Sequence, residues 1–567
     1  MTLFYDVPVG VRTAASLLLL RDGSAGLEVL MLQRAERSDG DMRSGVAVFP
    51  GGVLDARDRD AHAWCLGSGD AHWGEVFALS AGALDYAIAA VRETFEEVGV
   101  LLACAADGSA VDLAALAPAL APWRDRLHRG QATLGELCSH FNIRLDLRGL
   151  IYTAHWLTPP GLPKRWDTRF FTAAAPAFQD ASPDGGEALA VMWTTPAAAL
   201  HPDTGLKLLP AMRRMLSELQ IFADSRTALA ALAARGPVQR TMPRRAASSQ
   251  GVRIVGPDDF AYAEVGRLDP DGRADVSCEL LPGRAVALSG NVWRVTAPNP
   301  GPMTGPGTNS YLVGAGTRWT VIDPGPAIPS HQQALIDAAA AAGGRIERIL
   351  VTHTHRDHSP GAAPLAVTTG APVWGRVATH PEWQDDSFRP AHQPRHGEQI
   401  HVAPGLTLKV VHTPGHASNH LCFLLESEKL LFTGDHVMQG STVVINPPDG
   451  DMQVYLQSLN ALLSEDLLWL APGHGFLVDQ PHTVIRKLIA HRLAREAKVV
   501  QALQMARSAS TDALLSVVYA DVPAALHGVA RRSLLAHLLK LRAQGVAGVD
   551  IEHRIHENND AGPWMLL

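Results

Sequence analysis

The stretch Arg345-Ile-Glu-Arg-Ile-Leu-Val-Thr-His-Thr-His-Arg-Asp-His358 decides how the C-terminal half of the chain is interpreted. Its first seven residues are rich in β-formers and predict a strand that runs directly into a histidine cluster. Along an extended strand end His353 and His355 point the same way, so two imidazoles can bind one metal ion. Asp357 and His358 follow where the chain turns and can reach a second ion. A single histidine is more often a core or surface residue, but four potential ligands within six residues predict a metal site.

Three more potential ligands follow in chain order, each in a glycine-containing loop after an apolar or β-rich run. They are His416 in Thr413-Pro-Gly-His416, Asp435 in Phe432-Thr-Gly-Asp435 and His474 in Pro472-Gly-His-Gly475. Ligands at one edge of a sheet have this arrangement. Nitrogen-rich ligand sets favour Zn²⁺, with Mn and Fe as alternatives. Three nearby histidines are interpreted as structural, outer or solvent-facing neighbours: His412, His420 and His436.

This set of motifs resembles the metallo-β-lactamase superfamily, in which an HxHxDH motif precedes a distal His, an Asp and a last His. The resemblance implies an αββα sandwich and a hydrolytic reaction at a dinuclear centre, in which Asp357 is also catalytic. Two bound ions would lower the pKa of a shared water and clamp a carbonyl or phosphoryl oxygen. The implied assignment is His353, His355 and His416 on one ion, Asp357, His358 and His474 on the other, and Asp435 bridging.

The closer resemblance is to the lactamase-like protein 2 group of endoribonucleases within that superfamily. It is carried by Pro302-Met-Thr-Gly-Pro-Gly-Thr-Asn-Ser-Tyr-Leu-Val313 and by the tail segments His491-Arg-Leu-Ala-Arg-Glu496 and Ala536-His-Leu-Leu-Lys-Leu-Arg542. The tail is predicted helical, with apolar residues at near 3.6 spacing and basic residues around them. The resemblance implies a small winged-helix-like domain, and the basic helix favours single-stranded RNA as a substrate.

The N-terminal half offers a different chemistry, because its densest cluster is acidic. Tyr86 to Val100 is helical by propensity and ends near Gly99. Glu93, Glu96 and Glu97 stand at i, i+3 and i+4, so three carboxylates share one face. Like charges so placed repel unless a cation lies among them, and oxygen-only clusters suit Mg²⁺ or Mn²⁺. The alternative is a solvated acidic face, the commoner reason for a glutamate cluster.

Arg92-Glu-Thr-Phe-Glu-Glu-Val-Gly-Val100 resembles the core of the Nudix box, with Gly51 and Gly52 of Phe49-Pro-Gly-Gly52 as its leading glycines. About forty residues separate the glycines from Arg92. This insertion is similar to that of the Nudix group that includes peroxisomal coenzyme A diphosphatases, whose first box glutamate is here replaced by Asp58 or displaced. Further similar segments are Trp123-Arg-Asp-Arg126, Trp156-Leu-Thr-Pro-Pro160 and Arg165-Trp-Asp-Thr-Arg-Phe-Phe171.

The Nudix resemblance implies an α/β/α sandwich and a metal-dependent diphosphatase. Glu93, Glu96 and Glu97 would then hold Mg²⁺ or Mn²⁺, and Glu96 or Glu97 would help to activate the attacking water. The implied substrate is a small diphosphate, with a coenzyme A derivative as the first candidate.

The length of 567 residues predicts two or three domains of α/β and α+β type. The sequence around 230–290 is rich in glycine, proline and aspartate, which are typical of turns and linkers, and is interpreted as a domain junction. We therefore expect a Nudix-like domain with insertion at 1–235, a linker region at 236–285, a metallo-β-lactamase-fold domain at 286–480 and a winged-helix-like domain at 481–567.

The composition is that of an ordinary globular protein, with 47% hydrophobic and 19% charged residues. No apolar run approaches the roughly 18 residues of a membrane span. Ala14 to Leu20 is interpreted as a strand rather than as part of a signal peptide. The formal charge of -8 argues against a protein that coats nucleic acid along its whole surface. The five cysteines are widely spaced and form no CxxC pair, so we expect a reducing, cytoplasmic compartment and no membrane.

Three functions therefore remain open from the sequence. The first is a hydrolase with two sites, one dinuclear and acting on an RNA-like phosphodiester or an ester, the other of Nudix type. The second is a thioester or lactone hydrolase, because the same metal ligands serve carbonyl substrates. The third is an RNA-binding regulator with vestigial sites, against which the retention of all seven ligands weighs. Metal identity, coupling between the sites and oligomeric state are not predicted.

Overall fold

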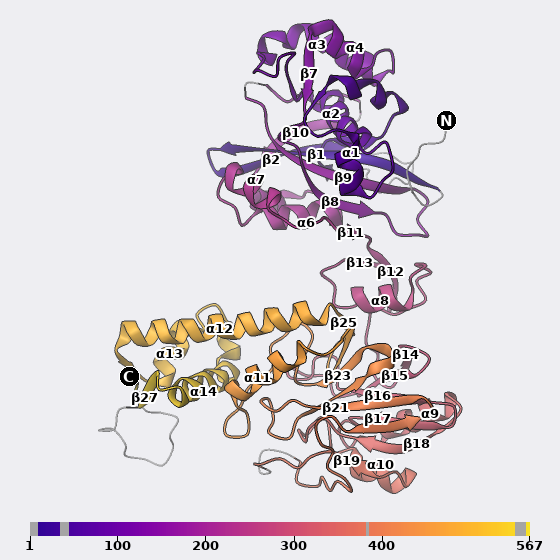
Figure 1. Ribbon diagram of the computed structural model, residues 1–567, viewed down its shortest axis with the longest axis vertical. Helices are drawn as coiled ribbons and strands as arrows, with labels where there is room; N and C mark the ends of the chain where they lie inside the picture. The colour runs from indigo at the N-terminus through magenta and orange to yellow at the C-terminus, as the bar shows by residue number, and fades with distance from the viewer. Residues whose placement is uncertain (1–9, 35–44, 178, 187, 381–384, 550–562) are drawn as a thin grey trace. The chain divides into compact units, whose positions relative to one another are not determined.

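The computed structural model describes residues 10–34, 45–177, 179–186, 188–380, 385–549 and 563–567 (Figure 1). The chain divides into two compact units. The first comprises Met1–Arg245 with Asp271–Arg273, and the second Ala246–Pro270 with Ala274–Leu567. In the described part of the chain, the helices lack the combination of length and apolar character that a bilayer crossing requires.

The first unit is built on a mixed sheet in the order β10-β2-β1-β9-β8-β11, with β3 beside β2 and β4 beside β1. The hairpin β1–β2 contains the apolar run that begins at Ala14. Leu17 to Leu20 are all at most 2% exposed, and because successive strand residues face opposite sides, both faces of β1 are covered. The strands are Val11–Gly23 (β1), Gly26–Arg34 (β2), Ala47–Val48 (β3), Gly51–Val53 (β4), Ile151–Leu157 (β8), Arg165–Ala174 (β9), Ala188–Thr194 (β10) and Arg240–Thr241 (β11).

Helix α2 (Leu84–Val98) packs against β1 and carries the predicted acidic cluster. It ends at Gly99, whose φ of 76° gives the left-handed C-terminal conformation that glycine favours. Helices α6 (Pro210–Leu219) and α7 (Ser225–Ala233) belong to the same unit, and α7 contacts β8 and β9. The expected α/β/α layering is therefore present.

A helical addition surrounds the second half of the box-like sequence. It consists of the 3-10 helix η1 (Ala56–Trp64), α3 (Leu113–His128) and α4 (Leu134–Phe141). A small sheet, β5-β7-β6, ties these pieces together through Cys65–Leu66, Ile143–Asp146 and Ala103–Ala105. Helix α3 contacts α2, so the addition lies directly against the acidic helix.

In the second unit, two mixed sheets pack face to face. Their orders are β14-β15-β16-β17-β18-β19 and β20-β21-β22-β23-β24-β25. One apolar cluster contains residues of both sheets, such as Val313 and Phe423, and so fills the space between them. The strands are Ala285–Ala287, Val292–Thr296, Asn309–Ala315, Arg318–Ile322, Arg345–Leu350 and Val373–Trp374 (β14 to β19), then Gln399–Ala403, Leu406–His412, Leu421–Leu425, Leu430–Gly434, Trp469–Pro472 and Val478–Asp479 (β20 to β25).

Helices cover the outer faces of both sheets. Leu335 of α9 (Pro329–Ala341) and Leu365 of α10 (Ala362–Thr369) share a core with the first sheet. Tyr455 and Leu459 of α11 (Met452–Leu462) share a core with the second. The layers are therefore helix, sheet, sheet, helix, as expected.

The tail forms a small helical domain with its own core. Helices α12 (Pro481–Ala506), α13 (Thr511–Val518) and α14 (His527–Ala543) enclose a fully buried Trp564 together with Leu503 and Leu534. The strands β26 (Ser508–Ala509), β28 (Trp564–Leu566) and β27 (Ala547–Val549) pair beside them.

Residues 246–270 fall in the region that the sequence assigns to a linker, yet they fold as part of the second unit. A hairpin of β12 (Arg244–Ser248) and β13 (Gly251–Val255) leads to α8 (Tyr262–Leu268). On α8, Glu264 accepts two hydrogen bonds from Arg294 of β15, at 2.6 and 2.8 Å. Both side chains are at most 3% exposed, so a buried ion pair attaches polar, turn-rich sequence to the sheet.

Candidate functional sites

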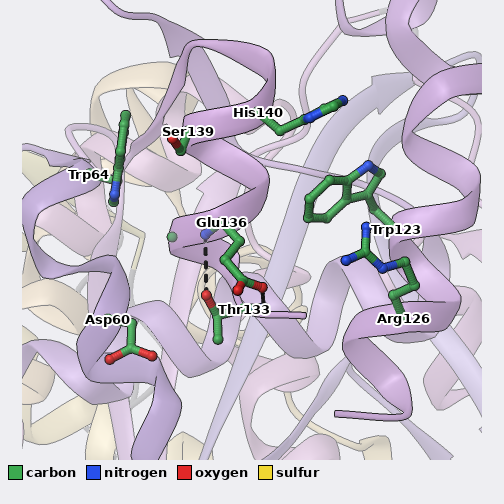
Figure 2. A pocket seen from close by; sticks show the side chains of 9 residues that line it. Asp60, Trp64, Trp123, Arg126, Thr133, Glu136, Ser139 and His140 are labelled. Carbon is green, nitrogen blue, oxygen red and sulfur yellow. Dashed lines mark hydrogen bonds between the residues drawn. The ribbon is translucent and has the colours of Figure 1, made fainter. Parts of the chain in front are cut away.

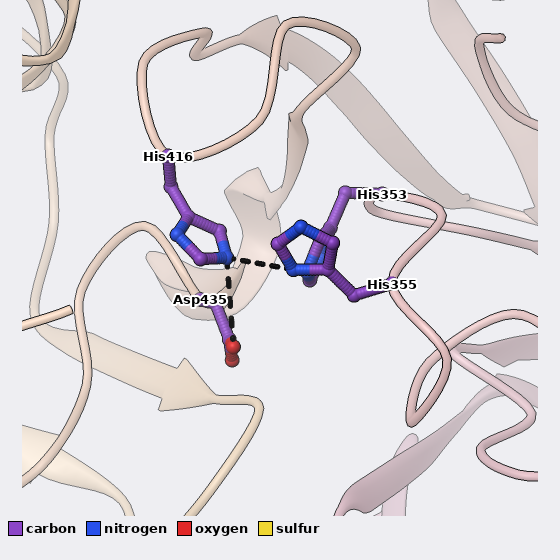
Figure 3. A group of neighbouring side chains, drawn as sticks. All are labelled: His353, His355, His416 and Asp435. Atoms are coloured by element: carbon purple, nitrogen blue, oxygen red, sulfur yellow. Dashed lines mark hydrogen bonds and ion pairs between the residues drawn. The ribbon is translucent and has the colours of Figure 1, made fainter. Parts of the chain in front are cut away.

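Among the described residues, two groups of side chains have ligand atoms that lie within 4.8 Å of one another. Figure 3 shows the first, in which the imidazoles of His353, His355 and His416 converge beside the Asp435 carboxylate. The second consists of Asp357, His358 and His474 with the same Asp435. The structure thus brings all seven predicted ligands together and makes one carboxylate common to both groups.

The ligands come from loops that follow four strands. His353, His355 and His358 follow β18, and His416 follows β21. Asp435 follows β23, and His474 follows β24, to which β23 is paired in parallel. Parallel neighbours end at the same edge, so these loops meet there.

Two of these loops run so close to their neighbours that only glycine fits before the ligand. Gly415 has a φ of 136°, and a Cβ there would lie within 2.5 Å of the Tyr455 backbone. A Cβ on Gly473 would lie 2.7 Å from Oδ1 of Asp435 and 2.7 Å from Cε1 of His358. The bare backbone therefore lets the ligand loops approach each other.

In the first group, Nε2 of His353 and Nε2 of His416 each lie 3.0 Å from Nδ1 of His355. Three ring nitrogens converging in this way need a proton or a cation among them. The other nitrogen of His416, Nδ1, is 2.7 Å from the carbonyl oxygen of Val444, which orients the ring and leaves Nε2 free to act as a ligand.

In the second group, Nε2 of His358 lies 3.3 Å from Asp435, and Nε2 of His474 lies 3.4 Å from it and 3.2 Å from Asp357. Both Nε2 atoms and Oδ1 of Asp435 are buried without a hydrogen-bond partner among the described atoms. Buried polar atoms are almost always satisfied, so this arrangement fits a bound cation. Imidazole nitrogens and carboxylate oxygens, which make up this group, are common ligands of divalent metals.

The charge states of the cluster agree with a cation site. Burial, together with His416 beside it, lowers the pKa of His355 to about 3, so its ring is neutral as a metal ligand must be. Burial also disfavours a charged His474, but the Asp435 and Asp357 carboxylates outweigh it and raise its pKa to about 9. The carboxylates thus attract positive charge into the cluster.

Sequence reasoning missed two outer residues, Asp323 and Thr352. Asp323 accepts hydrogen bonds from Nδ1 of His358 at 2.9 Å and from the amide and hydroxyl of Thr352, both at 2.7 Å. The Thr352 hydroxyl lies 3.0 Å from Nδ1 of His353. One carboxylate therefore orients a ligand in each group. The available signal was an aspartate after the buried run Trp319 to Ile322 and before Pro324.

Of the neighbouring histidines, His420 and His436 are fully buried and His412 is half-buried. His420 stacks on the His353 ring, with centroids 4.9 Å apart, and its Nδ1 is 2.9 Å from the Thr413 hydroxyl. The three residues lie outside both ligand groups.

In the first unit, Arg92 lies at the centre of the acidic helix. It donates to Asp58 at 2.6 Å, to Glu93 at 2.9 Å and to Glu96 at 3.3 Å. Asp58 is also buried. The bond between Asp58 and Arg92 therefore joins the two halves of the box-like sequence across the insertion. Burial, opposed by Arg92, raises the pKa of Glu93 to about 7.

Glu97 points to a different partner, because its Oε2 accepts a hydrogen bond from the amide of Gly51 at 2.9 Å. The leading glycine turn is thereby joined to the acidic helix. Among the described side chains, the three glutamates do not form one convergent group like those of the second unit.

The helical addition also holds the end of the acidic helix. Arg124 of α3 donates to the carbonyl oxygens of Glu96 and Glu97, at 2.7 and 2.6 Å, and to that of Ser182 at 2.8 Å. The last carbonyls of a helix have no partner within it, and a cation there is favourable. Although Trp123-Arg-Asp-Arg126 marked the segment, its sequence gave no sign of this role.

A hollow of about 830 Å³ opens on the same addition (Figure 2). The indoles of Trp64 and Trp123 stand on opposite sides of it, with Glu136 between them. The guanidinium of Arg126 lies over the Trp123 ring, 4.2 Å from its centroid. The remaining lining residues are Asp60, Thr133, Gly135, Ser139 and His140.

Three family models match separate parts of the chain. The metallo-beta-lactamase superfamily matches residues 303–474, the NUDT19 Nudix domain matches 75–204, and the beta-lactamase associated winged helix domain matches 510–550. These matches confirm the three domain types and their order.

Two curated relatives agree with these matches, and one solved structure is similar to part of the chain. The beta-lactamase-like protein 2 homolog of Caenorhabditis elegans is 30% identical over 46% of this chain and 86% of its own. The atrochrysone carboxyl ACP thioesterase of Aspergillus fumigatus is 32% identical over 42% of this chain and 76% of its own. A Nudix hydrolase from Alicyclobacillus acidocaldarius is similar to 40% of this chain and 98% of its own, with 25% identity and a TM-score of 0.34.

The chain belongs to the metallo-β-lactamase superfamily and carries a Nudix domain before that fold and a winged helix after it. With these domains it is a hydrolase, as the sequence predicted.

Proposed function

We propose that the second unit is a dinuclear hydrolase that holds two divalent ions, with zinc as the first candidate and Mn or Fe as alternatives. The carrying observation is the Asp435 carboxylate, which faces His353, His355 and His416 on one side and Asp357, His358 and His474 on the other. Seven ligands with one shared carboxylate suit two four- or five-coordinate ions.

When bound, such ions supply Lewis acidity and a water of lowered pKa. The protein contributes ligand orientation through Asp323 and the Val444 carbonyl. Asp357 is open to substrate, since its side chain is 28% exposed, whereas the side chains of Asp435 and His474 are 11% exposed or less. In addition to its place among the candidate ligands, we assign Asp357 a catalytic role as a proton acceptor.

For the substrate, an acyl thioester is our first candidate. A relative that matches this chain over 76% of its own length is named as an acyl-carrier-protein thioesterase. A coenzyme A thioester would also suit the Nudix domain, because the same molecule contains a diphosphate. Water would release a carboxylic acid and a free thiol at the dinuclear site, and the diphosphate bond would be hydrolysed at the Nudix site.

Single-stranded RNA is the second candidate, and it depends on the basic residues of α12. Two of these are buried and bonded within the unit: Arg492 donates to the carbonyl of Val443 and Arg495 to that of Val518. Lys498 pairs with Asp521 at 3.0 Å. Arg486 and Lys487 remain exposed. Because several basic side chains of α12 are bonded within the unit and are not free to contact a phosphate backbone, we prefer the thioester to RNA as the substrate.

For the first unit, we propose a Mg²⁺- or Mn²⁺-dependent diphosphatase of coenzyme A derivatives, with Glu93, Glu96 and Glu97 as metal-binding side chains. The support is the joining of the box halves through Asp58, Arg92 and Gly51. The Trp64 indole that lines the hollow in Figure 2 would stack on a nucleobase, and the carboxylates of Asp60 and Glu136 would accept hydrogen bonds from base amino groups.

Metal counting on the intact chain tests the dinuclear proposal. Asp435→Ala should reduce metal at both positions, whereas His416→Ala or His474→Ala should empty mainly one. A wild-type protein that binds fewer than two ions in the second unit, even with metal in excess, refutes a dinuclear centre.

A substrate panel separates the candidates. Acyl-coenzyme A should release thiol in wild type and in Glu96→Gln, but not in Asp435→Ala. Mg²⁺-dependent diphosphate cleavage should fall by orders of magnitude in Glu96→Gln or Glu97→Gln and survive Asp435→Ala. Cleavage of unstructured RNA without thiol release would replace the thioester by RNA. RNA binding with steep salt dependence and no turnover would favour a regulator.

A reducing compartment such as the cytoplasm suits the chain, since its five cysteines are all free.

A further inference from the structure

We infer that Gln439, anchored to the segment 246–270, is a positioning residue for the ligand group that contains Asp357, His358, Asp435 and His474. This inference rests on the proposed dinuclear function and makes the segment 246–270, which lies outside the family match at 303–474, a support of the metal site. It also gives the segment between the two domains a role in the hydrolase.

Gln439 joins two ligand loops to that segment. Its Oε1 accepts a hydrogen bond from the amide of Phe476 at 2.8 Å, two residues after His474. Its Nε2 donates to the carbonyl of Phe260 at 2.9 Å. Because Gln439 itself lies four residues after Asp435, its side chain connects the loop of Asp435 with the loop of His474.

Glu264 holds the next amide in the same loop. It accepts a hydrogen bond from the amide of Leu477 at 2.8 Å and, as noted above, the two hydrogen bonds of Arg294. Two consecutive amides behind His474 are therefore fixed by side chains from different parts of the chain. Since Phe260 and Glu264 belong to one short segment, that segment supports both bonds.

The Gln439 bonds set the position of the His474 loop relative to Asp435, but they are not needed to keep that loop attached to the sheet. The His474 loop has an independent anchor in Asn309, whose Nδ2 donates to the carbonyls of Pro472 and Gly475, at 3.1 and 2.8 Å. With Asn309 in place, loss of the Gln439 bonds leaves the loop attached but free to shift relative to Asp435. Metal affinity responds to such shifts, because coordination tolerates only a few tenths of an ångström.

The effect should fall mainly on one group. Thr352 orients His353 and the Val444 carbonyl orients His416, whereas Gln439 bonds to Phe260 and Phe476. In the other group, His474 lies in the loop that Gln439 holds through Phe476, so a shift of that loop acts on this group alone. We therefore expect weaker binding of the ion beside Asp357, His358 and His474. Binding of the ion beside His353, His355 and His416 should be retained.

The test is zinc titration of the metal-free full-length chain in competition with a chromophoric chelator. Gln439→Met keeps the length of the side chain and removes both hydrogen bonds. One of the two zinc affinities should fall about 10- to 100-fold, while the other changes by less than about threefold. Gln439→Glu keeps the acceptor for Phe476 and should recover part of the loss.

The matched control is Gln333→Met, the same substitution on α9, where the side chain donates to Asp337 within its own helix. It should leave both affinities unchanged. Equal weakening of both ions by Gln439→Met, or no weakening, overturns the positioning role. A wild-type chain that binds fewer than two ions instead refutes the dinuclear function, so the two failures are distinct.

Discussion

The buried ion pair between Glu264 and Arg294 allows a quantitative prediction about the second unit. Glu264→Ala leaves the Arg294 guanidinium, at most 3% exposed, without its two hydrogen bonds at 2.6 and 2.8 Å. Removing one partner of a buried pair costs about 3 to 5 kcal/mol, since a charge is left uncompensated. The amide of Leu477 also loses its acceptor, and a buried unpaired donor costs about 1 to 3 kcal/mol. The terms overlap, so we expect destabilisation near the upper end of the first range.

The assay is hydrogen exchange measured by mass spectrometry on the intact chain, which reports the opening free energy of peptides across Val292–Thr296. This avoids a single unfolding transition, which a multidomain chain does not provide. The double variant Glu264→Leu with Arg294→Met should cost less than Glu264→Ala alone, because it leaves no charge buried. A loss below about 1 kcal/mol in Glu264→Ala, or a double variant worse than the single one, would refute the reasoning.

Three further outcomes are expected. Asp323→Asn should weaken the ion beside His358 about 10- to 100-fold in a zinc competition titration, because it removes the charged acceptor of that ligand; an unchanged affinity would contradict this. Arg124→Ala should lower the diphosphatase rate about 10- to 100-fold by releasing the end of the acidic helix, and millimolar guanidinium should restore part of it; a wild-type rate would exclude a positioning role. Burial lowers the pKa of His331 to about 4, below its unfolded value of 6.5, so protonation favours unfolding. Stability contributed by neutral His331 should be lost as pH falls from 6.5 to 4, by up to about 3 kcal/mol, and the opening free energy from hydrogen exchange across Pro329–Ala341 should lack this part of the pH dependence in His331→Asn.

The convergence of the seven candidate ligands was predictable because a local sequence signal marks each of them. His353 to His358 follow a strand within a few residues, and His416 and His474 follow the pair Pro-Gly. Strand ends and glycine loops limit where the next side chain can go, so the sequence pattern carries geometric information. The four layers follow from the same alternation of strands and helices.

Residues that act through others were harder to predict. Asp323 is a lone aspartate far from the motifs in sequence, and its place between a β-rich run and Pro324 is also typical of a turn residue. Residues 246–270 have linker composition, and their attachment depends on Glu264 meeting an arginine thirty positions later. Arg124 finds its carbonyl partners through packing of α3 on α2. Such pairings are tertiary, and a single sequence does not encode them by periodicity or by spacing.

The close approach of the ligand loops has a consequence for how the site tolerates variation. Gly415 and Gly473 have no functional group, yet a single methyl at either position would overlap the Tyr455 backbone or the Asp435 carboxylate. In a saturation survey these two glycines should be as intolerant of substitution as the histidines that follow them, for a steric rather than a chemical reason. A descendant that kept all seven ligands but gained alanine at residue 473 would have to move its shared carboxylate. The positions that must stay unchanged for the site to keep its geometry are therefore more numerous than the residues that supply donor atoms.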